Sequence, residues 1–173
     1  QAVALALGMT ALLLLTVARG DLLEAWQTRV PVDAPNRFAI NIQPDQRVAI
    51  ADFFKTRSLP SPFLEPMVRG RLVQINDRAV GPENFDDDRA KRLIDREFNL
   101  SWASRLPQGN SIVGGHWHGT TSAAEFSVEQ GLAETLGLKL GDRLGYEIAG
   151  RRMEAVITSL RKLDWDSMRV NFF

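Results

Sequence analysis

SVEQGLAETLGLKLGDRLGYEIAG, residues 127–150, contains the clearest local folding signals of the chain. Ser127 and Gln130 have the S-x-x-Q spacing of a capping box, which predicts the start of a helix. Apolar residues then share one helical face, at Val128, Leu132 and Leu136. Gly137 is a C-terminal stop. The tight turn AGRR follows at 149–152, so 141–150 and 151–163 are predicted to form two strands of a hairpin.

Upstream segments alternate helix and strand without a regular βαβα order. Residues 110–117, NSIVGGHW, read as a strand that frays at its glycines. The helix predicted before it carries apolar residues four apart, at Ala90, Ile94 and Phe98. This mixed order predicts an α+β fold, in two lobes that divide near residue 77.

The segment 37–76 predicts a β-α-β opening. Phe38, Ile40 and Ile42 alternate with polar or small residues, which is typical of a half-buried strand. Pro44 and Asp45 then begin a helix with an inner face at Val48, Ala51 and Phe54. Residues 65–76 complete the unit as a strand pair or as one bent strand, with a bulge expected at Gly70.

The N-terminal run AVALALGMTALLLLTVA, residues 2–18, carries no charge. As a helix it is about 26 Å long at ~1.5 Å per residue, close to the roughly 30 Å hydrocarbon core of a bilayer. A signal peptide would need a charged region before the run and a small-residue cleavage site after it, and a buried core helix of this length suits a domain this small poorly. We therefore expect a transmembrane helix, followed by a polar helical stalk at Asp21–Thr28. Because both ends of the chain are apolar and the first residue is Gln1, we expect a fragment of a longer protein.

Composition excludes several classes. The net charge is zero, which argues against a nucleic-acid partner because such proteins carry basic surfaces. The chain has no cysteine, so disulfides and thiolate chemistry are absent.

His116 and His118 in GGHWHG (114–119) are the two histidines of the chain. On a strand an H-x-H pair points both rings to one face, a common start of a metal site. Catalytic zinc needs three protein ligands, and the nearest carboxylates, Glu125 and Glu129, lack ligand spacing. We therefore predict no metal site.

Other chemical readings are equally weak. Ser101, Ser111 and Ser127 lie outside any G-x-S-x-G elbow, and the FDDD loop (85–88) lacks the calcium-loop pattern. The glycines at 114–115 and 137–145 match no phosphate-binding motif. Asp164 and Asp166 form only a weak acid/base pair, and Trp102 and Trp165 fit a polar loop or a docking surface. We predict no catalytic, cofactor-binding or metal-binding residue, no cofactor and no enzymatic activity.

Five segments together resemble YbbP-type ABC transporter permeases of the FtsX/MacB/LolE superfamily. They are PNRFAINIQPDQ, EPMVRGRLVQIN, DREFNLSW, the stretch 127–150 and TSLRKLDWDSMRVNFF. The resemblance implies a MacB-like periplasmic core domain, with a porter-like α/β lobe and an inserted smaller lobe, preceded by one transmembrane helix. It divides the chain into a helix clipped at its N-terminus (1–19), a stalk (20–35), the first part of the porter-like lobe (36–76), and the inserted lobe with its connection (77–173).

The resemblance also implies a function. The chain would be part of the permease subunit of an ABC-type exporter in the bacterial inner membrane, with its main domain in the periplasm. A separate cytoplasmic ATPase would drive export or extraction of hydrophobic or lipid-like molecules. A lysophospholipase-type hydrolase and a second permease copy are further implied partners. Two competing hypotheses remain at this stage: a membrane-anchored scaffold that regulates a hydrolase without transport, and a tethered metal-dependent hydrolase.

Overall fold

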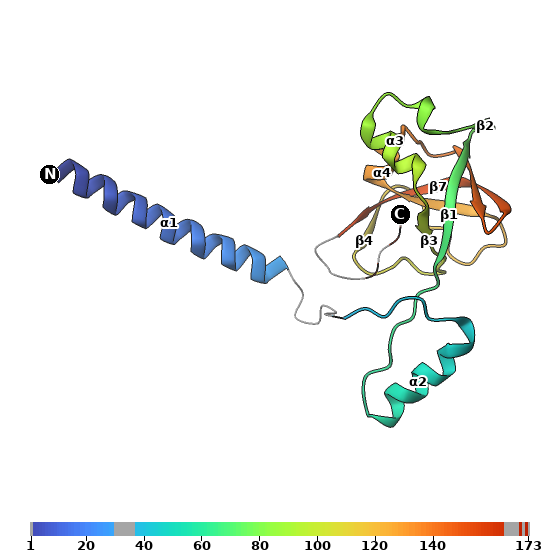
Figure 1. The fold of residues 1–173 in the computed structure, drawn as a ribbon, viewed down its shortest axis with the longest axis horizontal. Helices are drawn as coiled ribbons and strands as arrows, with labels where there is room; N and C mark the ends of the chain where they lie inside the picture. Colours follow the sequence, from blue (N-terminus) through green and yellow to red (C-terminus); the bar gives the residue numbers. More distant parts are fainter. Residues whose placement is uncertain (1, 30–36, 165–169, 171, 173) are drawn as a thin grey trace. The chain divides into compact units, whose positions relative to one another are not determined.

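The computed structural model describes residues 2–29, 37–164, 170 and 172. The chain divides into two units, each described here by itself. One contains helix α1 (Ala2–Arg29), and the other contains residues 39–164 with 170 and 172 (Figure 1). The expected helix over the N-terminal run is confirmed, and it continues without a break through Asp21–Thr28.

The second unit is built on a sheet whose described part has seven strands. In chain order they are β1 (Val68–Ile75), β2 (Arg78–Ala79), β3 (Phe98–Leu100), β4 (Asn110–Gly115), β5 (Glu125–Glu129), β6 (Arg143–Ile148) and β7 (Arg151–Leu163). The spatial order is β2-β1-β6-β7-β4, with β3 paired to β1 and β5 paired to β7. The β5–β7 pair is parallel and the other pairs are antiparallel.

Two short helices cover the core of this sheet. Helices α3 (Asp88–Asp95) and α4 (Gln130–Leu136) contact each other and lie close together in Figure 1. The most deeply buried side chains come from the strands and α3 alike, and include Leu72, Ile94, Phe98, Leu144 and Ile157. The mixed helix-and-sheet fold predicted from the sequence is confirmed.

The predicted hairpin at 141–163 is confirmed. Strands β6 and β7 pair from Arg143↔Val156 to Ile148↔Arg151. Ala149 (φ 49°) and Gly150 (φ 75°) join them with two left-handed residues, the turn whose twist matches the strands. The predicted strand at 110–117 is also found, as β4 at Asn110–Gly115.

Two helix boundaries were predicted wrongly. Helix α3 ends at Asp95 instead of reaching Phe98, because Arg96 is extended (ψ 163°). Phe98 is buried as expected, but through β3, where it pairs with Gly70. Helix α4 begins at Gln130 instead of Ser127, which lies in strand β5.

The β-α-β opening lacks its first strand in the described residues. Residues 37–43 form no strand, and Asn41 has a left-handed φ of 61°, which interrupts an extended segment. The predicted helix is present as η1 (Pro44–Gln46) and α2 (Arg47–Thr56). Its predicted inner face is not buried, since α2 buries no side chain.

The bulge expected at Gly70 lies further along β1. The register between β1 and β6 shifts between Leu72 and Gln74. Gly70 instead allows close packing, because a Cβ there would stand 2.7 Å from Leu100 Cδ1. The sheet contains β1 before residue 77 and β6 and β7 after it, so its hydrogen bonding crosses the predicted lobe division.

Candidate functional site

Helix α1 carries a segment long and apolar enough to cross a membrane. This segment, Leu5–Glu24, is about 30 Å long at ~1.5 Å per residue, and none of its described window is buried within the protein. Its leucines face all sides instead of one stripe, which is typical of a helix surrounded by lipid.

The two threonine hydroxyls of this segment form hydrogen bonds within the helix. Thr10 Oγ1 donates to the carbonyl oxygen of Ala6 at 2.8 Å, and Thr16 Oγ1 donates to that of Leu12 at 2.7 Å. In a hydrocarbon environment an unsatisfied hydroxyl is costly, so these bonds make both threonines compatible with lipid. The exposed charges Arg19, Asp21 and Glu24 mark the end of the apolar segment.

The histidine pair lies beyond the end of β4 instead of on a strand. Gly115 has a φ of 70°, and the chain turns away after His116 N–H donates to Thr158 O at 3.1 Å. His118 Nε2 lies 3.0 Å from Ala103 O, so it must carry the proton, because a carbonyl oxygen only accepts. Trp117 stacks on the His118 ring with centroids 4.3 Å apart, and its indole donates to Ser104 O. These contacts tie the loop before β4 to the loop after it.

The residues considered as metal ligands have other surroundings in the structure. Glu129 caps α4, accepting from Gly131 N at 2.8 Å and from Leu132 N at 2.7 Å. Glu125 Oε2 and His118 Nδ1 are each buried without a hydrogen-bond partner among the described residues. Among the described residues no group of three His, Cys, Asp or Glu side chains has a metal-binding arrangement.

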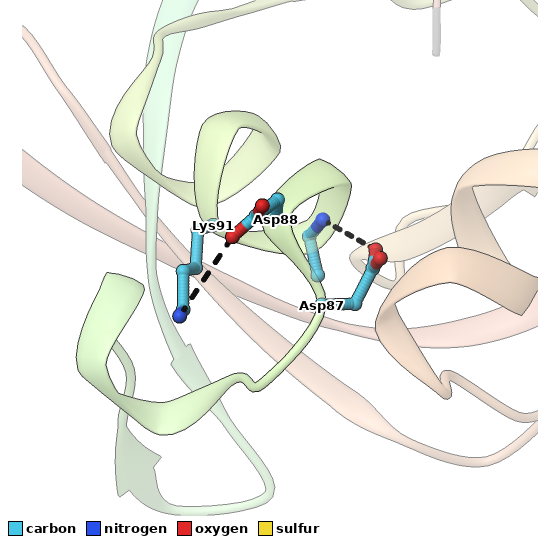
Figure 2. Close-up of polar contacts among 4 residues, drawn as sticks. Asp87, Asp88 and Lys91 are labelled. Atoms are coloured by element: carbon cyan, nitrogen blue, oxygen red, sulfur yellow. Dashed lines mark hydrogen bonds and ion pairs between the residues drawn. The ribbon is translucent and has the colours of Figure 1, made fainter.

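The acidic loop at 85–88 caps the beginning of helix α3. Asp87 Oδ2 accepts from Ala90 N at 2.9 Å as the N-cap, and Asp88 lies 4.0 Å from Lys91 on the exposed side (Figure 2). Carboxylates in the first turn of a helix are stabilised by its dipole, so this loop has a structural explanation.

The three serines considered in the sequence have different surroundings. Ser101 Oγ donates to Pro66 O at 2.7 Å, which fastens the end of β3 to the start of β1. The buried Ser127 hydroxyl has no hydrogen-bond partner in the described part of the chain, and Ser111 is exposed on β4. Trp102 is exposed, whereas Asp166 and Trp165 lie outside the described residues, so the Asp164–Asp166 pair has no described geometry.

A buried arginine on β7 was not predicted from the sequence. Arg161 is 6% exposed and donates to Asn110 Oδ1 at 2.7 Å and to Phe172 O at 2.6 Å. Burial lowers its pKa to about 10, while the Glu129 carboxylate raises it, so the guanidinium remains charged at neutral pH. The only signal in the sequence is that Arg161 occupies an inward position in the alternation Ala155, Ile157, Ser159.

One shallow hollow lies beside α4. Its volume is about 290 Å³, and apolar side chains that line it include Val113, Leu138 and Leu160. The charged Glu134 and Lys139 also line it.

The described residues therefore define an α+β domain that follows an apolar helix long enough to span a membrane. Over all 173 residues the chain is 39% identical to the "Uncharacterized ABC transporter permease YbbP" of Escherichia coli (strain K12). The resemblance to YbbP-type ABC transporter permeases is thus confirmed along the whole chain. The chain spans about a fifth of that relative's length, since the match covers 20% of it. No protein-family model and no solved structure matches the chain.

Proposed function

We propose that this chain contributes a transmembrane helix and part of an extracytoplasmic domain to the membrane permease subunit of an ABC-type exporter. The observation that carries the proposal is the 39% identity to YbbP along the entire chain. Helix α1 supports the proposal, because a membrane subunit requires an apolar helix whose polar groups are hydrogen-bonded within the helix.

We further propose that a separate cytoplasmic ATPase subunit binds and hydrolyses ATP. ATP binding would close the ATPase dimer and move the transmembrane helices, and the helical segment Asp21–Thr28 would pass this motion outward. Continuity of α1 to Arg29 suits a stiff lever. The cargo class proposed is hydrophobic or lipid-like molecules, with a lysophospholipase-type hydrolase and a second permease copy as further partners.

The domain belongs, in this proposal, to the MacB-like periplasmic core. Residues 36–76 would contribute the first part of the porter-like lobe and residues 77–173 the inserted smaller lobe with its connection, and the two parts share one sheet through the pairing of β1 with β6. Helix α2 supports the assignment indirectly. It leaves Val48 and Phe53 exposed, as a helix does when the surface that covers it lies in another part of the protein.

Placement of the domain in the periplasm is tested by cysteine labelling. The chain has no cysteine, so Ser111→Cys on exposed β4 gives a single reporter within it. A membrane-impermeant maleimide should label this site in intact cells of a Gram-negative host. Labelling that requires cell lysis would place the domain in the cytoplasm and overturn the proposed orientation.

Coupling through the stalk is tested by a double glycine. Replacing Glu24 and Ala25 with Gly-Gly weakens the helix by about 1 kcal/mol for each substitution. ATP hydrolysis should then continue while transport stops, because a flexible stalk no longer transmits motion. Normal transport in this variant would contradict the lever mechanism.

A further inference from the structure

Arg161 joins three segments that are far apart in the sequence. Its guanidinium bonds the Asn110 side chain at the start of β4 and the backbone carbonyl of Phe172. On the other side of β7, its register partner is Glu129, the residue that ends β5 and caps α4. One side chain therefore contacts, directly or through charge, the β4 strand, the segment near residue 172 and the beginning of α4.

The geometry favours a specific positioning role over a general packing role. A buried guanidinium is costly unless its donors are bonded and its charge is balanced. Arg161 meets both requirements, through two hydrogen bonds shorter than 2.8 Å and through the nearby Glu129 carboxylate. An apolar residue would fill the space without this cost, so the polar contacts are what distinguish arginine here.

The acceptor at Phe172 is a backbone atom. A bond to a peptide carbonyl fixes the path of the chain whatever the side chain, and Arg presents its donors in a rigid fork that lysine lacks. Before that contact, Asp164 N donates to Gly109 O at 2.7 Å, which extends the pairing of β4 and β7 by one step. Asp164 and Phe172 are thus both bonded at the β4–β7 end of the sheet.

We propose that Arg161 is a clasp that holds Phe172 against the β4–β7 end of the sheet and links its position to the Glu129 cap of α4. The mechanical consequence rests on the proposed permease function. In a permease driven by motion of its membrane helices, the clasp would make Phe172 move with the sheet.

The test is amide hydrogen exchange on the full-length protein in detergent, comparing Arg161→Lys and Arg161→Met with the unaltered protein. Peptides covering 164–173 should exchange at least about tenfold faster in both variants, as expected when a charged hydrogen bond is lost. Peptides of α3 should not change. Arg152→Met on the same strand is the matched control, because it removes an exposed ion pair with Glu154 and should leave 164–173 unchanged.

Two results would overturn the clasp. One is unchanged exchange at 164–173 in Arg161→Lys, and the other is faster exchange spread evenly over the domain, which indicates general destabilisation. If Arg161→Met does not fold, Arg161→Lys with Asn110→Ala decides the question, since Asn110→Ala leaves the Phe172 contact in place and should change 164–173 less. Exchange is measured without ATP, so a failure to find an ATPase partner would defeat the proposed function and leave this result intact.

Discussion

The Glu129 carboxylate accepts a 2.7 Å hydrogen bond from the backbone N–H of Leu132, and this contact begins helix α4. Its second oxygen accepts from Gly131 N–H, so one side chain satisfies two of the free donors at the helix start. Glu129 is therefore the N-cap of α4, the role that the S-x-x-Q spacing predicted for Ser127. Among the described residues the buried Ser127 hydroxyl has no hydrogen-bond partner.

Alanine substitution of each cap candidate distinguishes the role of Glu129 from that of Ser127. Glu129→Ala should lower the free energy of unfolding by about 1–2 kcal/mol, the usual cost of losing an N-cap. Ser127→Ala should be neutral or slightly stabilising, because it removes a buried hydroxyl that has no hydrogen bond. Thermal unfolding midpoints of the two variants measure this, and a larger loss for Ser127→Ala would show that the cap is assigned wrongly.

Gly115 has a left-handed φ of 70°, which is costly for a residue that carries a side chain. A Cβ there would also clash with the Thr158 carbonyl oxygen. Gly115→Ala should therefore cost several kcal/mol, through separation of β4 from β7. Gly119→Ala is the control: its φ is 60° with nothing near the added methyl, so only the left-handed penalty of about 1–2 kcal/mol remains. Equal unfolding midpoints for the two variants would contradict this.

The histidine loop should respond to mutation as a structural element. His118→Ala removes the contact with Ala103 O and should cost about 1 kcal/mol, whereas exposed His116→Ala should change little. Neither zinc nor a chelator should shift the unfolding midpoint of the unaltered protein. A rise with zinc that both variants abolish would restore the metal hypothesis.

Helix α1 should insert into membranes by itself. Leu14 lies near the centre of the apolar segment, so Leu14→Arg should disfavour insertion by about 2.5–3.5 kcal/mol, while Leu14→Ile should have no effect. The measurement places residues 2–29 as a test segment in a reporter membrane protein and scores the inserted fraction. Equal insertion of the arginine variant would contradict the transmembrane assignment.

The sequence was informative where local chemistry determined the structure. Gly150 favours the left-handed turn between β6 and β7 (φ 75°), and Gly137 ends α4 in the left-handed conformation (φ 68°) that glycine adopts readily. The 28-residue helix α1 was predicted because its apolar run is long and uninterrupted.

Tertiary contacts determined what the sequence could not. Phe98 keeps the four-residue spacing of a helix, yet it reaches the core through β3, which forms only because β1 offers Gly70 as its partner. Phe38 and Ile40 alternate as in a strand, but no partner strand in the described residues pairs with them. Arg161 could not be singled out, since its partners at Asn110 and Phe172 are distant in sequence.

The proposed function makes this chain part of a permease that works with a separate ATPase. ATP hydrolysis is measured in material purified in mild detergent through a tag on the full-length protein, and compared with the same tag on an unrelated inner-membrane protein. We expect a stoichiometric partner that hydrolyses ATP. Full-length protein that is recovered alone and inactive towards ATP would contradict the permease function and favour a membrane-anchored scaffold.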